Sequence, residues 1–287
     1  MKNADLREML NIALIAGLKA GKEIMEVYEG SLDIEIKKDG SPITLADKKA
    51  NSLIQSILSS SGIPVISEEN KIQGFEKREK WDWLWIVDPL DGTREFIEAN
   101  GEFTVNIALV RGQNPVLGVI VAPALEMACF GLENEHAHKI SDLRKLPNNL
   151  EEIGRMGLKE FARKIKGLPM NKDLSVAVSR SHYDSKTRDF IKKVVGRYEQ
   201  VNLISRGSSI KFCDLAENHA GIYPRFSTTY EWDTAAGHAI VKASGGEVFS
   251  LESRLPLQYN KENLLNPSFI AFADKNLSDR YFSELSP

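Results

Sequence analysis

The sequence predicts a layered α+β fold rather than a doubly wound parallel sheet. Segments of helical periodicity alternate with segments of strand pattern along the 287 residues, but without a strict strand–helix–strand rhythm. Two predicted strands are also joined directly by a short turn, as in an antiparallel hairpin. With 42% hydrophobic and 27% charged residues, the composition is that of an ordinary globular protein. The length suits one large domain or two closely packed halves.

The chain begins with a predicted amphipathic helix whose apolar residues recur at helical spacing. These residues are Leu6, Leu10, Ala13, Gly17, Ala20 and Ile24. Residues 32–36 alternate between apolar and polar, which predicts a half-buried strand, and a second helix is predicted to follow Thr44. Residues 64–66 form a short apolar strand that leads into Glu68 and Glu69.

The stretch 85–110 is the most informative part of the sequence. Its first three residues, Trp-Ile-Val, are an apolar run typical of a buried strand. Because proline cannot donate to a sheet ladder, we expect this strand to end at Asp88 and Pro89. Asp91 follows, and the glycine and threonine after it predict a tight turn that opens a short helix. Two carboxylates, a glycine and a hydroxyl around one bend suit divalent metal ions and phosphate.

A hairpin and a polar stretch follow. Residues 103–110 and 116–121 are predicted as two strands joined by a turn at 111–114, with a third strand at 127–132. Residues 134–173 are polar and poorly periodic, so we expect them to connect two halves.

We place the halves at residues 1–140, which hold most of the candidate metal ligands, and 141–287. The second half is predicted to contain one strand and three helices, at 174–178, 184–195, 208–218 and 233–243.

Composition excludes several classes of function. The net charge of −3 gives no basic surface for nucleic acid. No stretch is long and apolar enough to span a bilayer, although peripheral membrane association stays open. The two cysteines, Cys129 and Cys213, are far apart, which argues against a disulfide framework or a zinc site and favours a reducing cytoplasm. A monomer and a homodimer are both compatible with the sequence.

Acidic residues occur at four places far apart in the chain: Asp47, Glu68-Glu69, Asp88 with Asp91, and Asp233. Strand ends in one sheet lie side by side, so the acids that follow strands are expected to converge. Hard oxygen ligands suit Mg²⁺ or Mn²⁺, and crowded carboxylates need cations to neutralise them.

Each acid taken singly also has an ordinary interpretation. The Glu68-Glu69 pair suits a solvated turn, Asp47 a first-turn helix acid, and Asp233 a helix N-cap. The segment Asp-Pro-Leu-Asp-Gly-Thr at 88–93 differs, because two turn acids, a proline and a glycine rarely occur together for packing alone. Its spacing is not that of an EF-hand loop.

With these motifs the chain resembles the lithium-sensitive, magnesium-dependent phosphomonoesterase superfamily that includes inositol monophosphatase. The family pattern is a Glu-Glu pair, then Asp-Pro-[Ile/Leu]-Asp-Gly-Thr, then a Trp-Asp pair, and here these stand in order at 68–69, 88–93 and 232–233. The resemblance covers nearly the whole chain. It implies the αβαβα sandwich of the inositol monophosphatase and fructose-1,6-bisphosphatase type.

Finer features resemble one branch, the 3'(2'),5'-bisphosphate nucleotidases of the CysQ type. The segments that carry this likeness are 94–96 (REF), 100–109 (NGEFTVNIAL), 179–182 (SRSH), 207–211 (GSSIK), 223–226 (YPRF) and 231–240 (EWDTAAGHAI). The branch implies hydrolysis of the 3'-phosphate of 3'-phosphoadenosine 5'-phosphate, yielding AMP and phosphate. Activity on inositol phosphate or fructose 1,6-bisphosphate is an alternative, and so is a non-enzymatic metal- or nucleotide-binding regulator.

The resemblance also implies roles for the acids. Glu68, Asp88 and the carbonyl of Leu90 would hold one Mg²⁺, and Asp88, Asp91 and Asp233 a second, with a weaker third ion at Glu68. One carboxylate bridging two ions is reasonable because paired metals lie ~3.5–4 Å apart. Mn²⁺ is a possible substitute.

Three further residues would act on water or on the phosphate. Thr93 and Asp47 would orient and deprotonate the attacking water, and Glu69 would position another. The phosphate would contact the backbone N–H groups of Gly92 and Thr93. No covalent phosphoenzyme is implied, since the Asp-x-Asp motif of such enzymes is absent from the N-terminal region.

A bisphosphate nucleotide carries a second phosphate, which needs cationic partners. The resemblance places Lys211 and Arg225 there, with His182 and Ser208 beside them; the alternative is that they are ordinary surface and turn residues. Lys37 and Lys38 precede Asp47 at the approximate spacing of a phosphate-proximal lysine, but the alignment is ambiguous and assigns neither a role.

Overall fold

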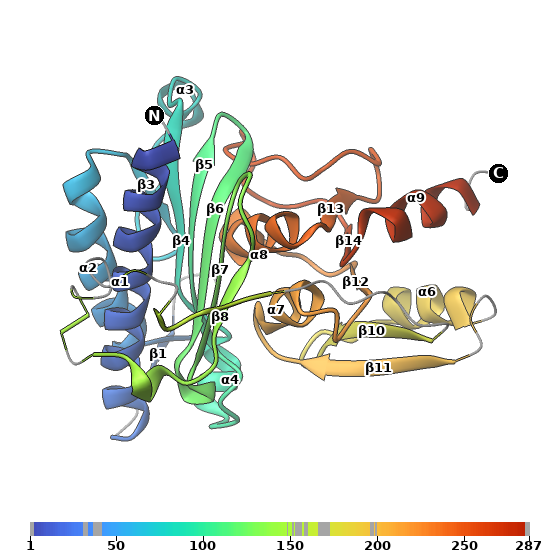
Figure 1. The fold of residues 1–287 in the computed structure, drawn as a ribbon, viewed down its shortest axis with the longest axis horizontal. Coiled ribbons are helices and arrows are strands. Elements are labelled where there is room, and N and C mark those ends of the chain that lie inside the picture. The colour runs from blue at the N-terminus through green and yellow to red at the C-terminus, as the bar shows by residue number, and fades with distance from the viewer. Residues whose placement is uncertain are drawn as a thin grey trace.

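The computed structural model describes residues 3–30, 34–36, 42–147, 149–150, 152, 157, 160–165, 173–195, 198 and 200–284. Helices and sheets alternate in five layers across the molecule (Figure 1). Two long helices cover one face of a seven-stranded sheet, two helices lie between that sheet and a five-stranded sheet, and two helices cover the outer face. The predicted α+β sandwich is therefore confirmed.

The first layer consists of α1 (Asn3–Tyr28) and α2 (Leu45–Leu58). The apolar residues that predict the first helix lie on one stripe, and α1 packs against the middle strands of the large sheet while α2 packs against β4. A small antiparallel pair, β1 (Ile34–Ile36) and β2 (Pro42–Thr44), precedes α2.

The large sheet has the order β3-β4-β5-β6-β7-β8-β9 and is antiparallel except for the parallel pair β3/β4. Its strands are β3 (Val65–Ser67), β4 (Trp83–Asp91), β5 (Thr104–Arg111), β6 (Asn114–Ala122), β7 (Met127–Leu132), β8 (His138–Ile140) and β9 (Arg163–Lys164). The predicted hairpin at 111–114 is confirmed, since Arg111 pairs with Asn114. Short helices α3 (Phe75–Arg78) and α4 (Thr93–Ile97) flank β4.

Two predictions about this sheet were incomplete or wrong. β4 does not stop at Asp88 and Pro89. It continues to Asp91 through a bulge in which two residues face one on β5, so the proline falls where the ladder is already interrupted. The stretch 134–173 is also more than a connection, because its described parts contribute β8 and β9. These strands are too short for their alternation to stand out from the polar sequence.

The five-stranded sheet has the order β11-β10-β12-β14-β13 and mixes parallel and antiparallel pairs. Its strands are β10 (Leu174–Ser179), β11 (Val201–Arg206), β12 (Ile222–Arg225), β13 (Glu247–Ser250) and β14 (Phe269–Phe272). Of these, the sequence predicts only β10.

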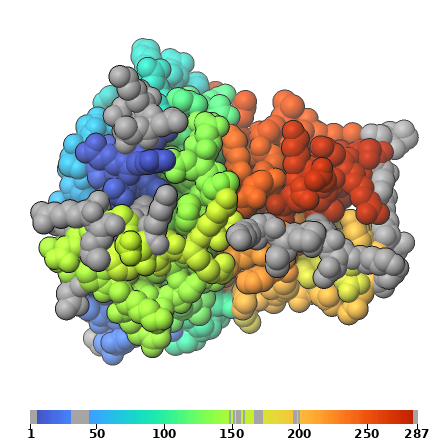
Figure 2. Space-filling view, in the orientation of Figure 1, coloured from blue at the N-terminus to red at the C-terminus, as the bar shows by residue number. Residues whose placement is uncertain are grey.

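The helices of the second half enclose this sheet. α7 (Ile210–Ala216) and α8 (Glu231–Ser244) lie between the two sheets, and α6 (Ser185–Val195) and α9 (Lys275–Glu284) pack on the outer face. The sequence predicts α6, α7 and α8 but not α9. In Figure 2 the blue and green N-terminal residues lie on one side of the surface and the orange and red C-terminal residues on the other; the boundary at residue 140 stays a prediction.

Among the described residues, three hydrophobic clusters fill the spaces between neighbouring layers. Along β4, Trp85 and Val87 face the core beneath α1 and α2, whereas Leu84 and Ile86 face the core around α7 and α8. This two-sided burial explains why the strand is continuously apolar. The third core joins the outer face of the five-stranded sheet to α6 and α9. Among the described helices, none is both long and apolar enough to cross a membrane.

Candidate active site

The predicted metal ligands converge where β3 and β4 end. Carboxylate oxygens of Asp88, Asp91 and Asp233 lie within 4.8 Å of one another, although Asp233 is more than 140 positions further along the chain. Glu68 lines the same cavity. Its place follows from the parallel pairing of β3 and β4, since the Glu68 amide donates to the Val87 carbonyl at 3.2 Å.

The bulge in β4 shapes this acidic end. Asp88 is only 1% exposed, and its Oδ1 accepts the amide of Leu90 at 3.1 Å. The bend turns Leu90, Asp91 and Gly92 toward the cavity, where all three are lining residues. The Gly92 φ of 88° is left-handed, and a Cβ there would lie 3.2 Å from the Glu102 carbonyl oxygen. Glycine is therefore required at this position.

Burial and mutual repulsion govern the carboxyl groups. The pKa of Asp88 is raised first by burial and then by the charges of Glu68, Asp91, Asp233 and Asp47. The pKa of Asp233 is raised by burial and then by Asp91. Such crowded carboxylates are stabilised by cations, and a set made only of oxygen donors fits Mg²⁺ or Mn²⁺.

Asp47 and Asp233 each lie in the first turn of a helix, α2 and α8 respectively. Asp233 is not the N-cap of α8. That position is Tyr230, whose amide donates to Asp233 Oδ2 at 2.8 Å. Asp47 is 1% exposed in the first turn of α2, and its Oδ2 accepts from the amide and the hydroxyl of Thr44 at 2.7 and 2.6 Å. Asp47 is therefore a first-turn helix acid, as its ordinary interpretation predicts. Its charge also raises the pKa of Asp88.

Thr93 lines the cavity and its hydroxyl donates to the Leu90 carbonyl at 3.4 Å. Asp47 and Glu69 are not among the lining residues, and the Glu69 amide donates to Ser67 Oγ at 3.4 Å. The water-orienting roles of these three side chains stay predictions. Lys37 and Lys38 lie outside the described residues.

The cavity has a volume of about 510 Å³ and is lined by cationic as well as acidic residues. Lys211, Arg225 and His182 line it together with the acids. The structure thus brings the residues predicted for metal binding and those predicted for the second phosphate into one cavity.

Lys211 is 3% exposed, and its Nζ donates to the carbonyls of Arg206 (3.2 Å) and Ser208. The ammonium also lies 5.3 Å from the ring centre of Tyr223. Burial, followed by the charge of Arg225, lowers the pKa of Lys211 to about 8. The lysine is therefore held in place by backbone carbonyls and gains from an anion.

Arg225 stands at the end of β12 and is 8% exposed. Its Nε is buried and has no hydrogen-bond partner in the part of the chain that the structure describes. A buried donor without a partner is costly. The residue as a whole lines the cavity, where its positive charge favours an anion.

Sequence reasoning missed the polar network around Asp91. Ser208 is predicted to bind substrate, yet its hydroxyl donates to Asp91 Oδ2 at 2.6 Å and contacts Thr104 Oγ1 at 2.6 Å. Asn106 approaches the same Asp91 oxygen at 3.4 Å. Ser208 has a φ of 50°, uncommon outside glycine. The segments 100–109 and 207–211 contained these residues, but nothing in them indicated this pairing.

The comparison with protein-family models decides the family. The model of the inositol monophosphatase family matches residues 5–286. The chain belongs to the inositol monophosphatase family. Among curated members, the 3'(2'),5'-bisphosphate nucleotidase CysQ of Escherichia coli K12 is 40% identical over 255 residues, which is 87% of this chain and 94% of that protein. CysQ of Haemophilus influenzae is 30% identical over 277 residues, with 95% of each chain covered.

Solved structures of the family agree with the fold. CysQ from Bacteroides thetaiotaomicron superposes with a TM-score of 0.84 at 43% identity, covering 95% of this chain and all of that chain. An inositol monophosphatase from Zymomonas mobilis gives a TM-score of 0.72 at 22% identity, covering 96% and 97% of the two chains. The second likeness shows the shared fold alone.

Proposed function

We propose that this family member is a Mg²⁺-dependent 3'(2'),5'-bisphosphate nucleotidase that converts 3'-phosphoadenosine 5'-phosphate to AMP and phosphate. One observation carries the proposal: a single cavity of about 510 Å³ is lined both by the carboxylates of Glu68, Asp88, Asp91 and Asp233 and by the cations Lys211 and Arg225. A substrate with two phosphates suits such a lining, with one phosphate at metal ions held by the acids and the other at the cations. The names of the CysQ relatives support this choice.

The acidic residues of the cavity provide the proposed metal site. Glu68, Asp88, Asp91 and Asp233, with the Leu90 carbonyl, would hold two or three ions, and all five residues line the cavity. When bound, Mg²⁺ supplies charge neutralisation at the phosphate and lowers the pKa of water.

The remaining steps belong to residues of this chain. The Gly92 and Thr93 amides orient the 3'-phosphate. Thr93, with Asp47, orients the attacking water and accepts its proton, and Glu69 positions a second water. The water oxygen bonds to phosphorus, and the bond from phosphorus to the 3'-oxygen breaks. The leaving 3'-oxygen takes up a proton from solvent water, and the proton accepted from the attacking water is released to solvent. Phosphoryl transfer demands little else than in-line positioning and charge stabilisation.

The cationic residues of the cavity select a substrate that carries a second phosphate. Arg225 and Lys211 would bind the 5'-phosphate, with His182 and Ser208 beside them. We further propose a cytoplasmic location and a small-molecule substrate as the only partner that the activity requires.

The test of the proposal is phosphate release with Mg²⁺ from 3'-phosphoadenosine 5'-phosphate, measured beside inositol 1-phosphate and fructose 1,6-bisphosphate. We expect a strong preference for the nucleotide, and Asp91→Asn should abolish most turnover on every substrate because it removes a metal ligand. A preference for either sugar phosphate would contradict the proposed substrate. Failure to hydrolyse any of them with saturating Mg²⁺ would favour the regulator.

A substitution at Arg225 tests the second-phosphate site. Arg225→Ala should raise KM for the bisphosphate by roughly 10-fold or more, as the loss of a charge-assisted hydrogen bond does, and should barely change KM for 3'-AMP. Lys192→Ala, which removes an exposed cation on α6, is the control and should change neither. Equal losses on both substrates would argue against the assignment.

A further inference from the structure

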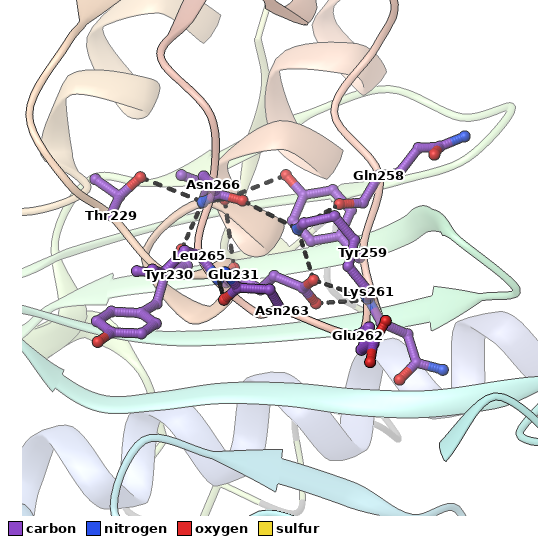
Figure 3. A network of polar contacts seen from close by, with 12 residues as sticks. Thr229, Tyr230, Glu231, Gln258, Tyr259, Lys261, Glu262, Asn263, Leu265 and Asn266 are labelled. Carbon is purple, nitrogen blue, oxygen red and sulfur yellow. Dashed lines mark hydrogen bonds and ion pairs between the residues drawn. The ribbon is translucent and has the colours of Figure 1, made fainter. Parts of the chain in front are cut away.

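The segment 257–266 packs against the first turn of α8, the turn that contains Asp233 (Figure 3). It follows β13 and pairs with the chain just before the helix, through a bridge between Leu265 and Tyr230 and a bond from the Glu231 amide to the Leu264 carbonyl at 3.0 Å. No residue predicted from the sequence to belong to the site lies in this segment. It nevertheless contacts the residues on both sides of Asp233.

Asn266 makes most of these contacts. Its Nδ2 donates to the Tyr230 carbonyl at 2.7 Å, to Thr234 Oγ1 at 3.0 Å and to Thr229 Oγ1 at 3.3 Å. Its backbone amide donates to the Thr229 carbonyl at 2.8 Å. In Figure 3 dashed lines run from Asn266 to its neighbours at the start of the helix. Asn266 is thus bonded to Tyr230, three residues before Asp233, and to Thr234, the residue after it, while Asn266 itself does not line the cavity.

The contact with Tyr230 connects Asn266 to the metal ligand. Tyr230 donates its amide to Asp233 Oδ2 at 2.8 Å and presents its carbonyl to Asn266. The Tyr230 carbonyl also accepts the Asp233 amide at 3.2 Å, so the Asn266 side chain is a second donor to this carbonyl. Together with the Leu265 bridge, Asn266 therefore holds the backbone whose amide donates to the Asp233 carboxylate.

A buried ion pair fixes the segment itself. The Glu231 side chain is fully buried, and its carboxylate accepts from the amides of Asn260 (2.5 Å) and Lys261 (3.0 Å) and from Lys261 Nζ (2.6 Å). Glu231 is the first residue of α8. Because a buried carboxylate with this many donors tolerates little displacement, the segment and the helix start are held together as one unit.

The segment 257–266 is also bonded to a residue of α3, which precedes β4 of the large sheet. Arg78 at the end of α3 is 2% exposed, and its guanidinium donates to Asn260 Oδ1 at 2.8 Å and to the Lys261 carbonyl at 3.1 Å. Asn260 returns a bond to the Arg78 carbonyl at 2.8 Å. Asp88 and Asp91 lie on β4, which follows α3 in the chain. The segment 257–266 therefore connects the start of α8, with Asp233, to the part of the chain that carries the other proposed metal ligands.

We propose that Asn266 is a positioning residue for the metal site: it holds the Tyr230 backbone that orients Asp233, and so raises the affinity of the site for divalent cations. The inference rests on the proposed metal role of Asp233. Residues that orient ligands typically contribute 10–100-fold to metal affinity. Asn266→Asp keeps the size of the side chain but removes its donor, and it places an acceptor against the Tyr230 carbonyl.

The test is Mn²⁺ binding to the full chain without substrate, by titration calorimetry. Asn266→Asp and the milder Asn266→Ser, which keeps one donor, should raise the Mn²⁺ Kd by roughly 10-fold or more and by a smaller factor, respectively. In the matched control Asn263→Ala, an exposed asparagine of the same segment that bonds only to Leu265 among the contacts seen, the Kd should not change. At saturating Mg²⁺ the KM for substrate should stay near wild type.

The outcomes separate the inference from the function beneath it. If Asp233→Asn weakens Mn²⁺ binding but both Asn266 variants bind like wild type, the inference is overturned and the metal site stands. Reduced stability with an unchanged Kd in the Asn266 variants also overturns it, because their role is then only structural. If Asp233→Asn binds like wild type, the proposed metal role fails and the inference with it.

Discussion

Burial shifts the pKa values of the acids and of the lysine that line the cavity in opposite directions. It raises the pKa of Asp88 and Asp233, and it lowers the pKa of Lys211 to about 8. Neighbours of like charge add to both effects, Asp91 for Asp233 and Arg225 for Lys211. Each group is therefore stabilised by a ligand of opposite charge, cations beside the acids and an anion beside the lysine.

The lowered pKa of Lys211 predicts a pH-dependent KM. Lys211 carries its charge below about pH 8 and loses it above that value, so affinity for the bisphosphate should fall as pH rises from 7 to 9.5. Steady-state KM measured across this range should increase, and KM for 3'-AMP should increase much less. In Lys211→Ala the difference between the substrates should no longer vary with pH. An equal rise for both substrates in wild type would contradict the role of Lys211.

At the scale of elements, α8 carries Asp233 and fits closely between its neighbours. A Cβ at Gly118 on β6 would lie 2.1 Å from the Ala236 carbonyl oxygen, and one at Gly237 would lie 2.3 Å from the Phe212 ring. Glycines therefore set how near the helix approaches the large sheet and α7. This distance decides whether Asp233 reaches the acids of β4.

Gly118→Ala should force α8 away from the sheet. We expect the free energy of unfolding to fall by about 1–3 kcal/mol, as in other overpacked cores, and the Mg²⁺ concentration for half-maximal activity to rise. Urea denaturation measures the first effect. Gly74→Ala is the control, since a Cβ there meets nothing within 4 Å and its φ is −57°. A Gly118→Ala protein as stable as Gly74→Ala would contradict the close fit.

On the scale of the whole molecule, the site joins segments that lie far apart in the chain, so metal binding should stabilise the fold. In the folded protein the pKa values of Asp88 and Asp233 lie above the ordinary value of an aspartate. A carboxyl with a raised folded pKa contributes stability below the unfolded pKa, and this contribution is lost as pH rises through the folded pKa. The metal-free protein therefore loses stability as pH rises and these carboxyls ionise, and bound Mg²⁺ offsets this loss.

We expect Mg²⁺ to raise Tm at pH 7.5, with about 2.7 kcal/mol of stabilisation at 100 times Kd. The increase should shrink as pH falls toward 5, because protons then compete for the same carboxylates. Thermal denaturation with EDTA or Mg²⁺ at several pH values measures both effects, and Asp233→Asn should show a smaller increase. An increase that is independent of pH would show that these carboxyls do not bind the ion.

Local patterns in the sequence determined the layered α+β class, most of the first half and the identity of the acids. The run at 85–87, the hairpin at 111–114 and the helices around 45–58 and 231–244 depend on periodicity and turn chemistry over a few residues, which a single sequence displays. The Asp-Pro-Leu-Asp-Gly-Thr motif belongs to the same class of signal. Its residues are neighbours in both sequence and space.

Only the tertiary structure decided which distant residues meet. Ser208 and Asp91 are 117 positions apart and share a hydrogen bond, and Asn266 contacts Tyr230 across 36 positions. The continuation of β4 past Pro89 depends on its pairing with β5, and β8 and β9 are strands only because a sheet edge was available to them. Such contacts leave no periodicity along the chain, because they arise from the packing of layers whose order is set after each element has formed.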